Sequence, residues 1–263
     1  EHLVVQDIFM TETAWNADII LPASAHAEKT GTYTNTNRQV QIGRAVVEPP
    51  KEVRQDWWII QEIAKRMGLG WDYKSPKDIF DEMKLVMPSL DNISWERLEK
   101  DNHVTYPVKS ELIPGEDIIF TNGFPTSNNL AKIIPVNLIN PNDELNSDFP
   151  LILSTGRLLE HWHTGTMTRR AVVLNELEPD PMIFMSQVDS NFYNLDLNKS
   201  VIIETRRGKI SIKIRHDDDL LPGMIFLPFC FKEAAANILT NSDLDPIGKI
   251  PELKFSAARV YQN

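Results

Sequence analysis

The chain changes character near residue 102, and this change constrains its fold more than any other feature. Before it, the apolar runs "LVVQDIF" and "DIILPA" predict two short buried strands, and "TETAWNA" between them has helical composition. A strand, a short helix and a second strand in succession indicate a parallel α/β unit. The polar segment "EKTGTYTNTNRQVQ" that follows has the composition of a loop.

Three helices are predicted between residues 56 and 101. Asp56 can cap the helix "WWIIQEIAKRMG", which Gly68 ends, and four of its side chains are expected on one face: Trp57, Ile60, Ala64 and Met67. Ser75, followed by a proline, begins "KDIFDEMKLVM", and Ser94 begins "WERLEKD". The first half is therefore expected to be an α/β domain.

After residue 102 the helical periodicity disappears, and proline and asparagine become frequent. Short β-prone pieces follow, namely "DIIFTNGF", "AKIIPVNLI", "FPLILST", "SVIIETRRGKISIKIR" and "GMIFLPF". The "RRG" tripeptide between two β-branched runs is typical of a hairpin. We therefore expect a mainly β second half that forms a closed barrel. Because "NPNDELNSD" has the composition of a linker, the predicted domains are residues 1–135 and 148–263.

Composition excludes several classes of protein. The 263 residues carry a formal net charge of −10, which argues against a general nucleic-acid binder because neutralising phosphates needs a basic face. No apolar run approaches the roughly 18 residues that span a bilayer. Cys230 is the only cysteine, so neither an internal disulfide nor a cysteine-based zinc or iron–sulfur site can form within the chain. This cysteine usage fits a reducing compartment.

The beginning of the chain is unusual. It opens at Glu1 and enters a strand-like run at once, without the charged region, apolar core and cleavage site of a signal peptide. Strands rarely begin a native chain without a lead-in, so we expect a fragment of a longer protein.

The segment "LSTGRLLEHWHTGTMTRR", residues 153–170, concentrates cationic and hydroxyl side chains after a strand-like run. If the run ends as a strand, the next residues lie in the loop at its end, where ligand sites are common. Guanidinium groups and hydroxyls are suitable donors for a pyrophosphate. A solvated cationic loop anchored by Trp162 is nearly as good an interpretation. A metal site at His161 and His163 is weaker, because no third ligand has suitable spacing.

Other candidates favour ordinary structure. Cys230, between two phenylalanines, is expected to be a buried small side chain and not a nucleophile. The aspartates of "HDDDLLPG" lack the alternate spacing of a calcium loop and indicate a surface turn. Glu28 and Asp56 show no spacing that supports acid–base catalysis. The familiar nucleotide-binding and hydrolase motifs are absent from the sequence.

Several long strings, in order, carry a resemblance that covers essentially the whole chain. They are "VVQDIFMTETAWNADIILPASAHAEKTGTYTNTNRQVQ", "RQDWWIIQEIAKRMGL", "FPTSNNLAKIIP", "STGRLLEHWHTGTMTRR", "TRRGKI" and "EAAANILTNSDLDPIGKIPELKFSAARV". The chain resembles the C-terminal part of the large subunit of molybdopterin oxidoreductases. Within that family it is most similar to the catalytic α subunit of NAD-linked formate dehydrogenases.

The resemblance implies a fold class and a cofactor. The fold would be α/β plus β, with part of a Rossmann-like α/β domain followed by a double-psi β-barrel. The cofactor would be bis-molybdopterin guanine dinucleotide with molybdenum or tungsten. The family's metal-ligating Cys or selenocysteine, its adjacent His and its [4Fe-4S] cysteines all lie upstream of residue 1. The resemblance therefore implies no catalytic and no metal-ligating residue in this chain, which would be inactive alone.

The resemblance also implies which residues of this chain contact the cofactor. Gln6 and Asp56 match contacts to the nucleotide end in the α/β domain, and Phe229 matches a position near the pterin or the substrate funnel. The remaining matches are in the barrel: Thr155, Gly156, Arg157, His161, Trp162, His163, Thr164, Thr166, Asn237 and Lys254. Their chemistry agrees, because Arg and Lys neutralise pyrophosphate and Asp56 can accept from guanine N–H groups.

The implied activity is oxidation of formate to CO2 in the cytoplasm, with electrons passing through iron–sulfur clusters to β and γ subunits that carry flavin and reduce NAD. The strings "EAAANILTN", "GKIPELKF" and "QDIFMTETA" favour formate dehydrogenase over the nitrate reductase branch, which shares the "TGRxLEHWHTGxMTRR" pattern. A non-catalytic electron-transfer or structural subunit on the same scaffold is a third interpretation. It is disfavoured because Arg157, His161, His163 and Arg169 are all retained.

Overall fold

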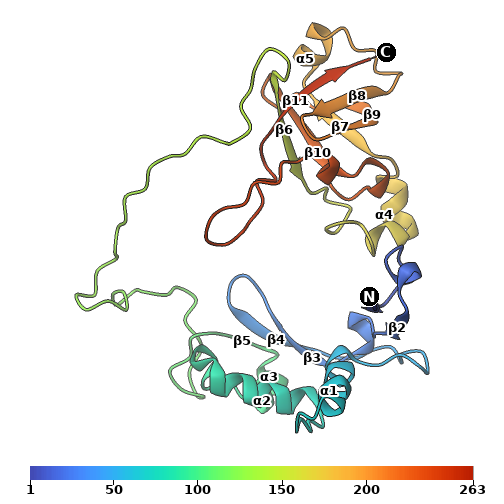
Figure 1. The fold of residues 1–263 in the computed structure, drawn as a ribbon. Helices are drawn as coiled ribbons and strands as arrows, with labels where there is room; N and C mark the ends of the chain where they lie inside the picture. Colours follow the sequence, from blue (N-terminus) through green and yellow to red (C-terminus); the bar gives the residue numbers. More distant parts are fainter. Residues whose placement is uncertain (263) are drawn as a thin grey trace. The chain divides into compact units, whose positions relative to one another are not determined.

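A computed structural model describes residues 1–262, and the chain divides between Ile134 and Pro135 into two units (Figure 1). The N-terminal unit ends at Ile134, and the barrel unit begins at Pro135. Among the described residues, no helix combines the length and the apolar character needed to cross a bilayer.

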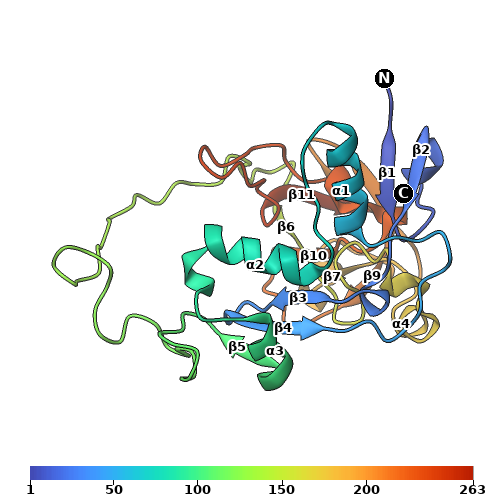
Figure 2. The same cartoon turned by 90° about the horizontal axis from the view of Figure 1, so that it is seen from below.

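The N-terminal unit begins with a pair of parallel strands that lie side by side (Figure 2). β1 (Val4–Asp7) and β2 (Ile19–Pro22) pair from Val4 opposite Ile19, and the 3-10 helix η1 (Ala14–Asn16) lies between them in sequence. The predicted parallel unit is confirmed. The prediction of buried strands is wrong, because Val4 and Ile19 are each 46% exposed. Apolar runs of this kind are typical of sheets covered on both faces, and no further described strand pairs with β1 or β2.

The polar segment after β2 is a hairpin, so the predicted loop is wrong. After the 3-10 helix η2 (His26–Glu28), β3 (Gly31–Thr34) pairs antiparallel with β4 (Gln39–Gly43), which also pairs with β5 (His103–Thr105). Arg38 (φ 67°) makes the turn, and its guanidinium donates to three backbone carbonyls, including that of Asp117 at 2.7 Å. Fully buried Val40 lies opposite Val104. Threonine and tyrosine favour strands, but strand pairing, not local composition, decides this segment.

Three helices follow in this unit, α1 (Asp56–Arg66), α2 (Pro76–Val86) and α3 (Trp95–Asp101). Helices α2 and α3 pack with the sheet of β3, β4 and β5. The 3-10 helix η3 (Pro88–Leu90) follows α2. The buried side chains beneath the sheet come from β4, β5, α2, α3 and their connections: Val40, Phe80, Leu90, Ile93, Trp95, Leu98, Val104 and Val108. The predicted start of α3 is confirmed, since the Ser94 hydroxyl accepts from the Arg97 N–H at 3.2 Å.

Two predictions for α1 are wrong. Gln55, not Asp56, is at the N-cap position, and the buried residues are Ile59, Gln61 and Ala64, while Met67 is 75% exposed. The reason is a contact outside the helix. The Gln61 side-chain amide donates to the Tyr73 carbonyl at 3.1 Å and accepts from the Tyr73 N–H at 2.6 Å. This contact turns the Gln61 face toward the connection to α2, so helical periodicity alone selects the wrong stripe.

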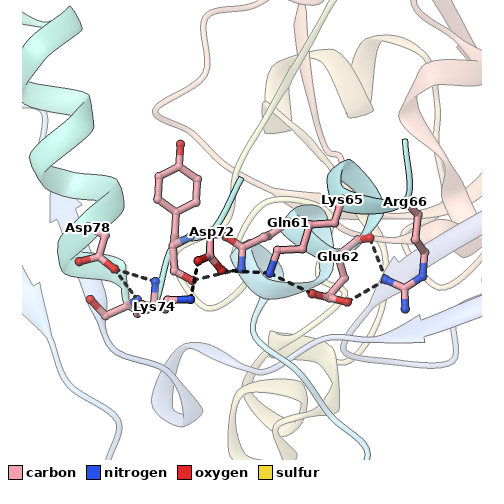
Figure 3. Close-up of polar contacts among 9 residues, drawn as sticks. Gln61, Glu62, Lys65, Arg66, Asp72, Lys74 and Asp78 are labelled. Carbon is pink, nitrogen blue, oxygen red and sulfur yellow. Dashed lines mark hydrogen bonds and ion pairs between the residues drawn. The ribbon is translucent and has the colours of Figure 1, made fainter. Parts of the chain in front are cut away.

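The connection between α1 and α2 is held by exposed ion pairs (Figure 3). Glu62 pairs with Arg66 at 2.8 Å within α1, and Asp72 receives Lys65 at 3.4 Å and Lys74 at 2.6 Å. At the start of α2 the Asp78 carboxylate accepts from the N–H of Lys74 at 2.6 Å and from that of Ser75 at 3.1 Å. The predicted helix start at Ser75 is confirmed. Exposed pairs contribute about 0.2–1 kcal/mol each, so they orient the connection more than they stabilise it.

Residues 106–150 contain no helix and no strand, so the predicted β-prone pieces "DIIFTNGF" and "AKIIPVNLI" are wrong. Ile133, Leu138 and Ile139 are 91%, 99% and 89% exposed. A strand needs a partner for its backbone N–H and C=O groups, and no described strand pairs with this segment.

The barrel unit contains a closed barrel of strand order β10-β6-β11-β8-β9-β7, as the composition of the second half predicted (Figure 1). Its strands are β6 (Leu151–Gly156), β7 (Met182–Met185), β8 (Val201–Thr205), β9 (Lys209–His216), β10 (Met224–Pro228) and β11 (Ser256–Tyr261). The predicted "RRG" hairpin is confirmed as the antiparallel pair β8–β9. Alternate residues point inward, as in the pattern of β8, so one continuous apolar core fills the barrel.

Short helices connect the barrel strands. They are η4 (Thr168–Arg170), α4 (Val172–Leu177), α5 (Gln187–Phe192), η5 (Lys232–Ala234) and η6 (Ala236–Ile238). β6 pairs in parallel with β10, and β7 pairs in parallel with β9, whereas the other pairs are antiparallel. The parallel β6–β10 pair directs the chain out of the barrel at one shared edge.

Asp143 fastens the segment before β6 to the barrel. Its carboxylate is 3% exposed, accepts from the guanidinium groups of Arg206 and Arg207, and accepts from the Ala257 N–H of β11 at 2.7 Å. Burial alone would raise the pKa of Asp143, but the hydrogen bonds and charge of the arginines, with the Ala257 N–H, outweigh it and lower the pKa. The carboxylate is therefore ionised in the fold and holds three parts of the chain together.

Candidate functional site

The predicted ligand loop leaves the barrel where β6 and β10 end side by side. Gly156 pairs with Pro228, and the Phe229 N–H donates to the Gly156 carbonyl at 3.1 Å. A side chain at position 156 would overlap the Phe226 ring, so this close approach requires glycine. The structure therefore brings Phe229 to the start of the loop that the sequence predicted, although the two are more than 70 residues apart.

The outer part of this loop presents exposed polar groups. The Arg157 guanidinium stacks on the Trp162 ring at 5.3 Å and makes no hydrogen bond to any residue in the described part of the chain. His163 has a left-handed backbone (φ 52°), and its ring meets that of Phe229 edge-to-face at 5.5 Å. The hydroxyls of Thr164 and Thr166 lie 3.3 Å apart on the exposed side. These donors remain available to a ligand with several acceptor oxygens.

Two of the predicted contact residues point into the barrel unit instead. Thr155 is 3% exposed, and its hydroxyl donates to the Leu253 carbonyl at 2.7 Å. His161 is 2% exposed, with its Nε2 atom 2.7 Å from the Glu178 carbonyl oxygen and its Nδ1 atom 3.3 Å from the Thr168 hydroxyl. The side-chain polar atoms of Thr155 and His161 are hydrogen-bonded within the barrel unit, so these two residues support the loop and do not face a ligand.

The two remaining predicted positions in this unit differ in their relation to the loop. The exposed Lys254 ammonium group donates to the Thr155 carbonyl at 2.5 Å and brings the segment before β11 to the end of β6. Asn237 lies in η6 with an exposed side chain, and no hydrogen bond among residues 135–262 joins it to the loop. Lys254 thus adds a positive charge at the base of the loop, and Asn237 does not extend it.

Arg169 supports the loop and was not among the predicted contacts. Its guanidinium lies 4.9 Å from the Phe231 ring centroid and donates to Glu233 at 2.7 Å. Burial would raise the pKa of Glu233, but the hydrogen bond and charge of Arg169, with a backbone hydrogen bond and the charge of Lys232, together outweigh it and lower the pKa. The sequence offered only its place in a cationic run, which does not distinguish a supporting arginine from a ligand-binding one.

The two predicted contact residues of the N-terminal unit meet each other. The Gln6 amide donates to Asp56 at 2.8 Å, and Lys29, which the sequence analysis missed, donates to the other carboxylate oxygen at 2.5 Å. Burial would raise the pKa of Asp56, but the hydrogen bonds from Lys29 and Gln6 outweigh it and lower the pKa. The side chain of Asp56 is 41% exposed, so its ionised carboxylate can still accept from a ligand. No local pattern marks Lys29, because it lies 27 residues from Asp56 in sequence.

Gly165 closes the loop against the chain after β10. It has a φ of +76°, and a Cβ atom there would lie 2.7 Å from the Cys230 carbonyl oxygen and 2.9 Å from the Arg169 stem. Gly165→Ala is expected to destabilise the protein by about 2 kcal/mol, from left-handed strain and the backbone contact. The free energy of unfolding from a urea titration checks this. Gly31→Ala, at a glycine with open space, is the control, and an equal effect of both would contradict the account.

Cys230 is buried, as predicted, at 1% exposure. Burial raises the pKa of its thiol to about 11. The folded protein is therefore expected to react with iodoacetamide at least about a hundredfold more slowly than a free thiol, because the thiolate is the reactive form. Labelling followed by mass spectrometry measures this rate, and the denatured protein should react at the ordinary rate. Fast labelling of the folded protein would contradict the buried thiol.

Both units of the chain match known protein families. The family model "Molybdopterin oxidoreductase" matches residues 1–66, and "Molydopterin dinucleotide binding domain" matches residues 151–257, which include the loop, Phe229 and Lys254. Acetylene hydratase from Pelobacter acetylenicus has a similar fold, with a TM-score of 0.76 over all of this chain and 40% of that one, at 21% identity.

Curated relatives match along nearly the whole chain. F420-dependent formate dehydrogenase subunit alpha of Methanocaldococcus jannaschii is 42% identical over 99% of this chain, and a Methanococcus maripaludis counterpart is 38% identical over 99%. Formate dehydrogenase H of Escherichia coli is 32% identical over 99%. The chain spans 39%, 39% and 37% of the lengths of these relatives. With two family models and these relatives in agreement, the chain belongs to the molybdopterin oxidoreductase family and matches formate dehydrogenase α subunits.

Proposed function

We propose that this chain is the cofactor-holding part of a formate dehydrogenase α subunit and binds a molybdopterin guanine dinucleotide. The observation that carries the proposal is the loop after β6, where Arg157, His163, Thr164 and Thr166 present donors on one exposed edge. Pyrophosphate and pterin groups offer many acceptor atoms, so the donor set fits this cofactor.

Each unit would hold part of the cofactor pair. In the barrel unit, Arg157 and Lys254 would neutralise phosphate charge, Trp162 would support Arg157 by stacking, and Phe229 would lie against the pterin. In the N-terminal unit, Asp56 would accept from guanine N–H groups while Gln6 and Lys29 hold its carboxylate in place. We assign residues 1–135 to a Rossmann-like α/β domain and residues 148–263 to a double-psi β-barrel. The arrangement of six strands with two parallel pairs supports the second assignment.

The chemistry would belong to the bound metal, and this chain would supply orientation and charge. When bound, the molybdenum or tungsten centre of the cofactor would supply the two-electron chemistry that oxidises formate to CO2. No residue of this chain would act at the reacting atoms. Iron–sulfur clusters held outside residues 1–263 would pass the electrons to partner subunits in the cytoplasm.

The electron acceptor is where the sequence expectation and the relatives' names differ. The resemblance implied NAD-reducing β and γ subunits, whereas the relatives from both methanogens are named F420-dependent. Their identities of 42% and 38% favour F420 as a second candidate acceptor.

An activity assay on the intact purified complex tests the proposed function. Formate is expected to reduce an artificial dye and one of the two acceptors, NAD or F420, and nitrate is not expected to reoxidise the reduced dye. Nitrate-dependent dye oxidation without formate activity would favour the nitrate reductase alternative. Bound cofactor without either activity would favour the non-catalytic subunit.

A further inference from the structure

The His161 ring uses both of its nitrogen atoms inside the loop that it belongs to. Nε2 lies 2.7 Å from the Glu178 carbonyl oxygen, and a carbonyl only accepts, so Nε2 carries the proton. In a neutral ring Nδ1 is then an acceptor, and the Thr168 hydroxyl, 3.3 Å away, is the group that donates to it. The buried ring is held edge-on to Phe231 at 5.6 Å, which fixes its orientation.

The Thr168 hydroxyl makes a second hydrogen bond, which completes a hydrogen-bond network. It accepts from the Trp162 N–H at 3.0 Å, so hydrogen bonds run from Trp162 to Thr168, from Thr168 to His161, and from His161 to Glu178. Every donor in this hydrogen-bond network meets an acceptor only when His161 is neutral with its proton on Nε2. The hydrogen bond between the Trp162 N–H and the Thr168 hydroxyl brings the two ends of the turn formed by residues 162–168 together.

The enclosed residues are the ones that face outward. His163, Thr164 and Thr166 all lie between Trp162 and Thr168, and all three are exposed. Two backbone bonds brace the same turn, from Gly165 to the Trp162 carbonyl and from Arg169 to the Gly165 carbonyl, both at 2.9 Å. An ordered loop loses less entropy when a ligand binds than a loop that must be ordered first.

We propose that His161 and Thr168 are positioning residues, which hold His163, Thr164 and Thr166 in the conformation that binds the cofactor. This inference rests on the proposed function. It gives His161 a different task from the one that the family resemblance implied, since its ring has no nitrogen left for the cofactor. The hydroxyl of Thr168, which the resemblance did not include, becomes as important as the ring.

Two substitutions at one position separate the hydroxyl from the shape of the side chain. Thr168→Val keeps the branched shape and removes the hydroxyl, whereas Thr168→Ser keeps the hydroxyl. The readout is guanine nucleotide that remains on the intact protein during dialysis, measured after acid release. We expect Thr168→Val to release it roughly tenfold faster than wild type, because two bonds of the hydrogen-bond network are lost, and Thr168→Ser to remain within about twofold.

Nitrogen NMR of the histidine side chains tests the same inference without the cofactor. Comparison with His161→Gln assigns the His161 signals, which are expected to show a neutral ring protonated on Nε2. A ring without a proton on Nε2 would overturn the inference, because Nε2 could then make no hydrogen bond to the Glu178 carbonyl.

The outcomes distinguish this inference from the proposed function. A wild-type protein that releases no guanine nucleotide overturns the proposed function and the inference with it. A wild type that holds nucleotide, together with equal release from Thr168→Val and Thr168→Ser, overturns the inference alone. Rescue by serine cannot come from shape, because valine matches threonine more closely in shape than serine does.

Discussion

Arg157→Ala is expected to weaken cofactor binding by about 2 kcal/mol, or roughly thirtyfold, as a charge-assisted hydrogen bond to phosphate is lost. Arg157 is the suitable position because its guanidinium is stacked on Trp162 and makes no hydrogen bond to the rest of residues 1–262. Its removal should therefore cost little stability. The rate at which guanine nucleotide leaves the intact protein during dialysis measures the effect.

Two controls define what Arg157 contributes. Arg157→Lys keeps the charge and loses the planar fork, so it should release nucleotide at a rate between wild type and Arg157→Ala. Lys199→Ala removes an exposed positive charge elsewhere in the barrel unit, where the Lys199 ammonium group lies 3.8 Å from the Asp196 carboxylate, and should behave as wild type. Equal weakening by Arg157→Ala and Lys199→Ala would show a general effect of charge and would contradict a specific phosphate contact.

Asp143→Ala is expected to lower the free energy of unfolding of the barrel unit by about 3 kcal/mol. Its loss leaves Arg206 and Arg207 without their shared carboxylate and the Ala257 N–H of β11 without its acceptor. Hydrogen exchange of the β11 amides, together with urea titration, measures the loss. Asp148→Ala removes an exposed acid from the same segment and should change stability by less than about 0.5 kcal/mol. Slow exchange at Ala257 in Asp143→Ala would contradict the account.

The contribution of Asp143 should also depend on pH. The fold lowers the pKa of this carboxyl below its ordinary value of 3.8, so folding favours the ionised form. The stabilisation is complete above the pKa of the unfolded state and is lost as the pH falls through the lower pKa of the folded state. The stability difference between wild type and Asp143→Asn should therefore be constant near neutral pH and shrink in acid. A difference that grows in acid would contradict the direction of the shift.

Local sequence was sufficient where short-range interactions decide the structure. The β-branched runs around "RRG" form the antiparallel pair β8–β9, and the start of α3 at Ser94 depends on one hydrogen bond to Arg97, three residues later. The barrel core follows from alternation, because inward positions along each strand are apolar. Residue chemistry pointed to the ligand loop as a candidate anion site, and the resemblance, not periodicity, identified most of its predicted contact residues.

Long-range contacts decided where the predictions were wrong. Asp56 was expected to cap α1, yet it accepts from Gln6, 50 residues away, and from Lys29, 27 residues away. The buried face of α1 depends on the contact between Gln61 and Tyr73. The sequence of α1 alone cannot predict the role of Asp56 or the buried face of the helix, because Gln6, Lys29 and Tyr73 all lie outside the helix.

The direction of a side chain is the other feature that the sequence left open. His161 and His163 are two residues apart in one loop, yet the first is buried with both nitrogens bonded and the second is exposed beside Phe229. The difference comes from the left-handed backbone at His163 and the acceptor at Glu178. Residue type alone therefore could not distinguish a supporting histidine from a ligand-facing one.

The most direct test of the central claim is the amount of guanine nucleotide that acid releases from the intact protein. The account predicts that wild type releases it and that the double variant Arg157→Ala and Lys254→Ala releases much less. The matched double variant Lys199→Ala and Lys213→Ala should equal wild type, because Lys213 is an exposed lysine of β9 that has no predicted cofactor contact. Wild-type amounts in the first double variant, or none in wild type, would contradict the claim that the loop after β6 holds a molybdopterin guanine dinucleotide.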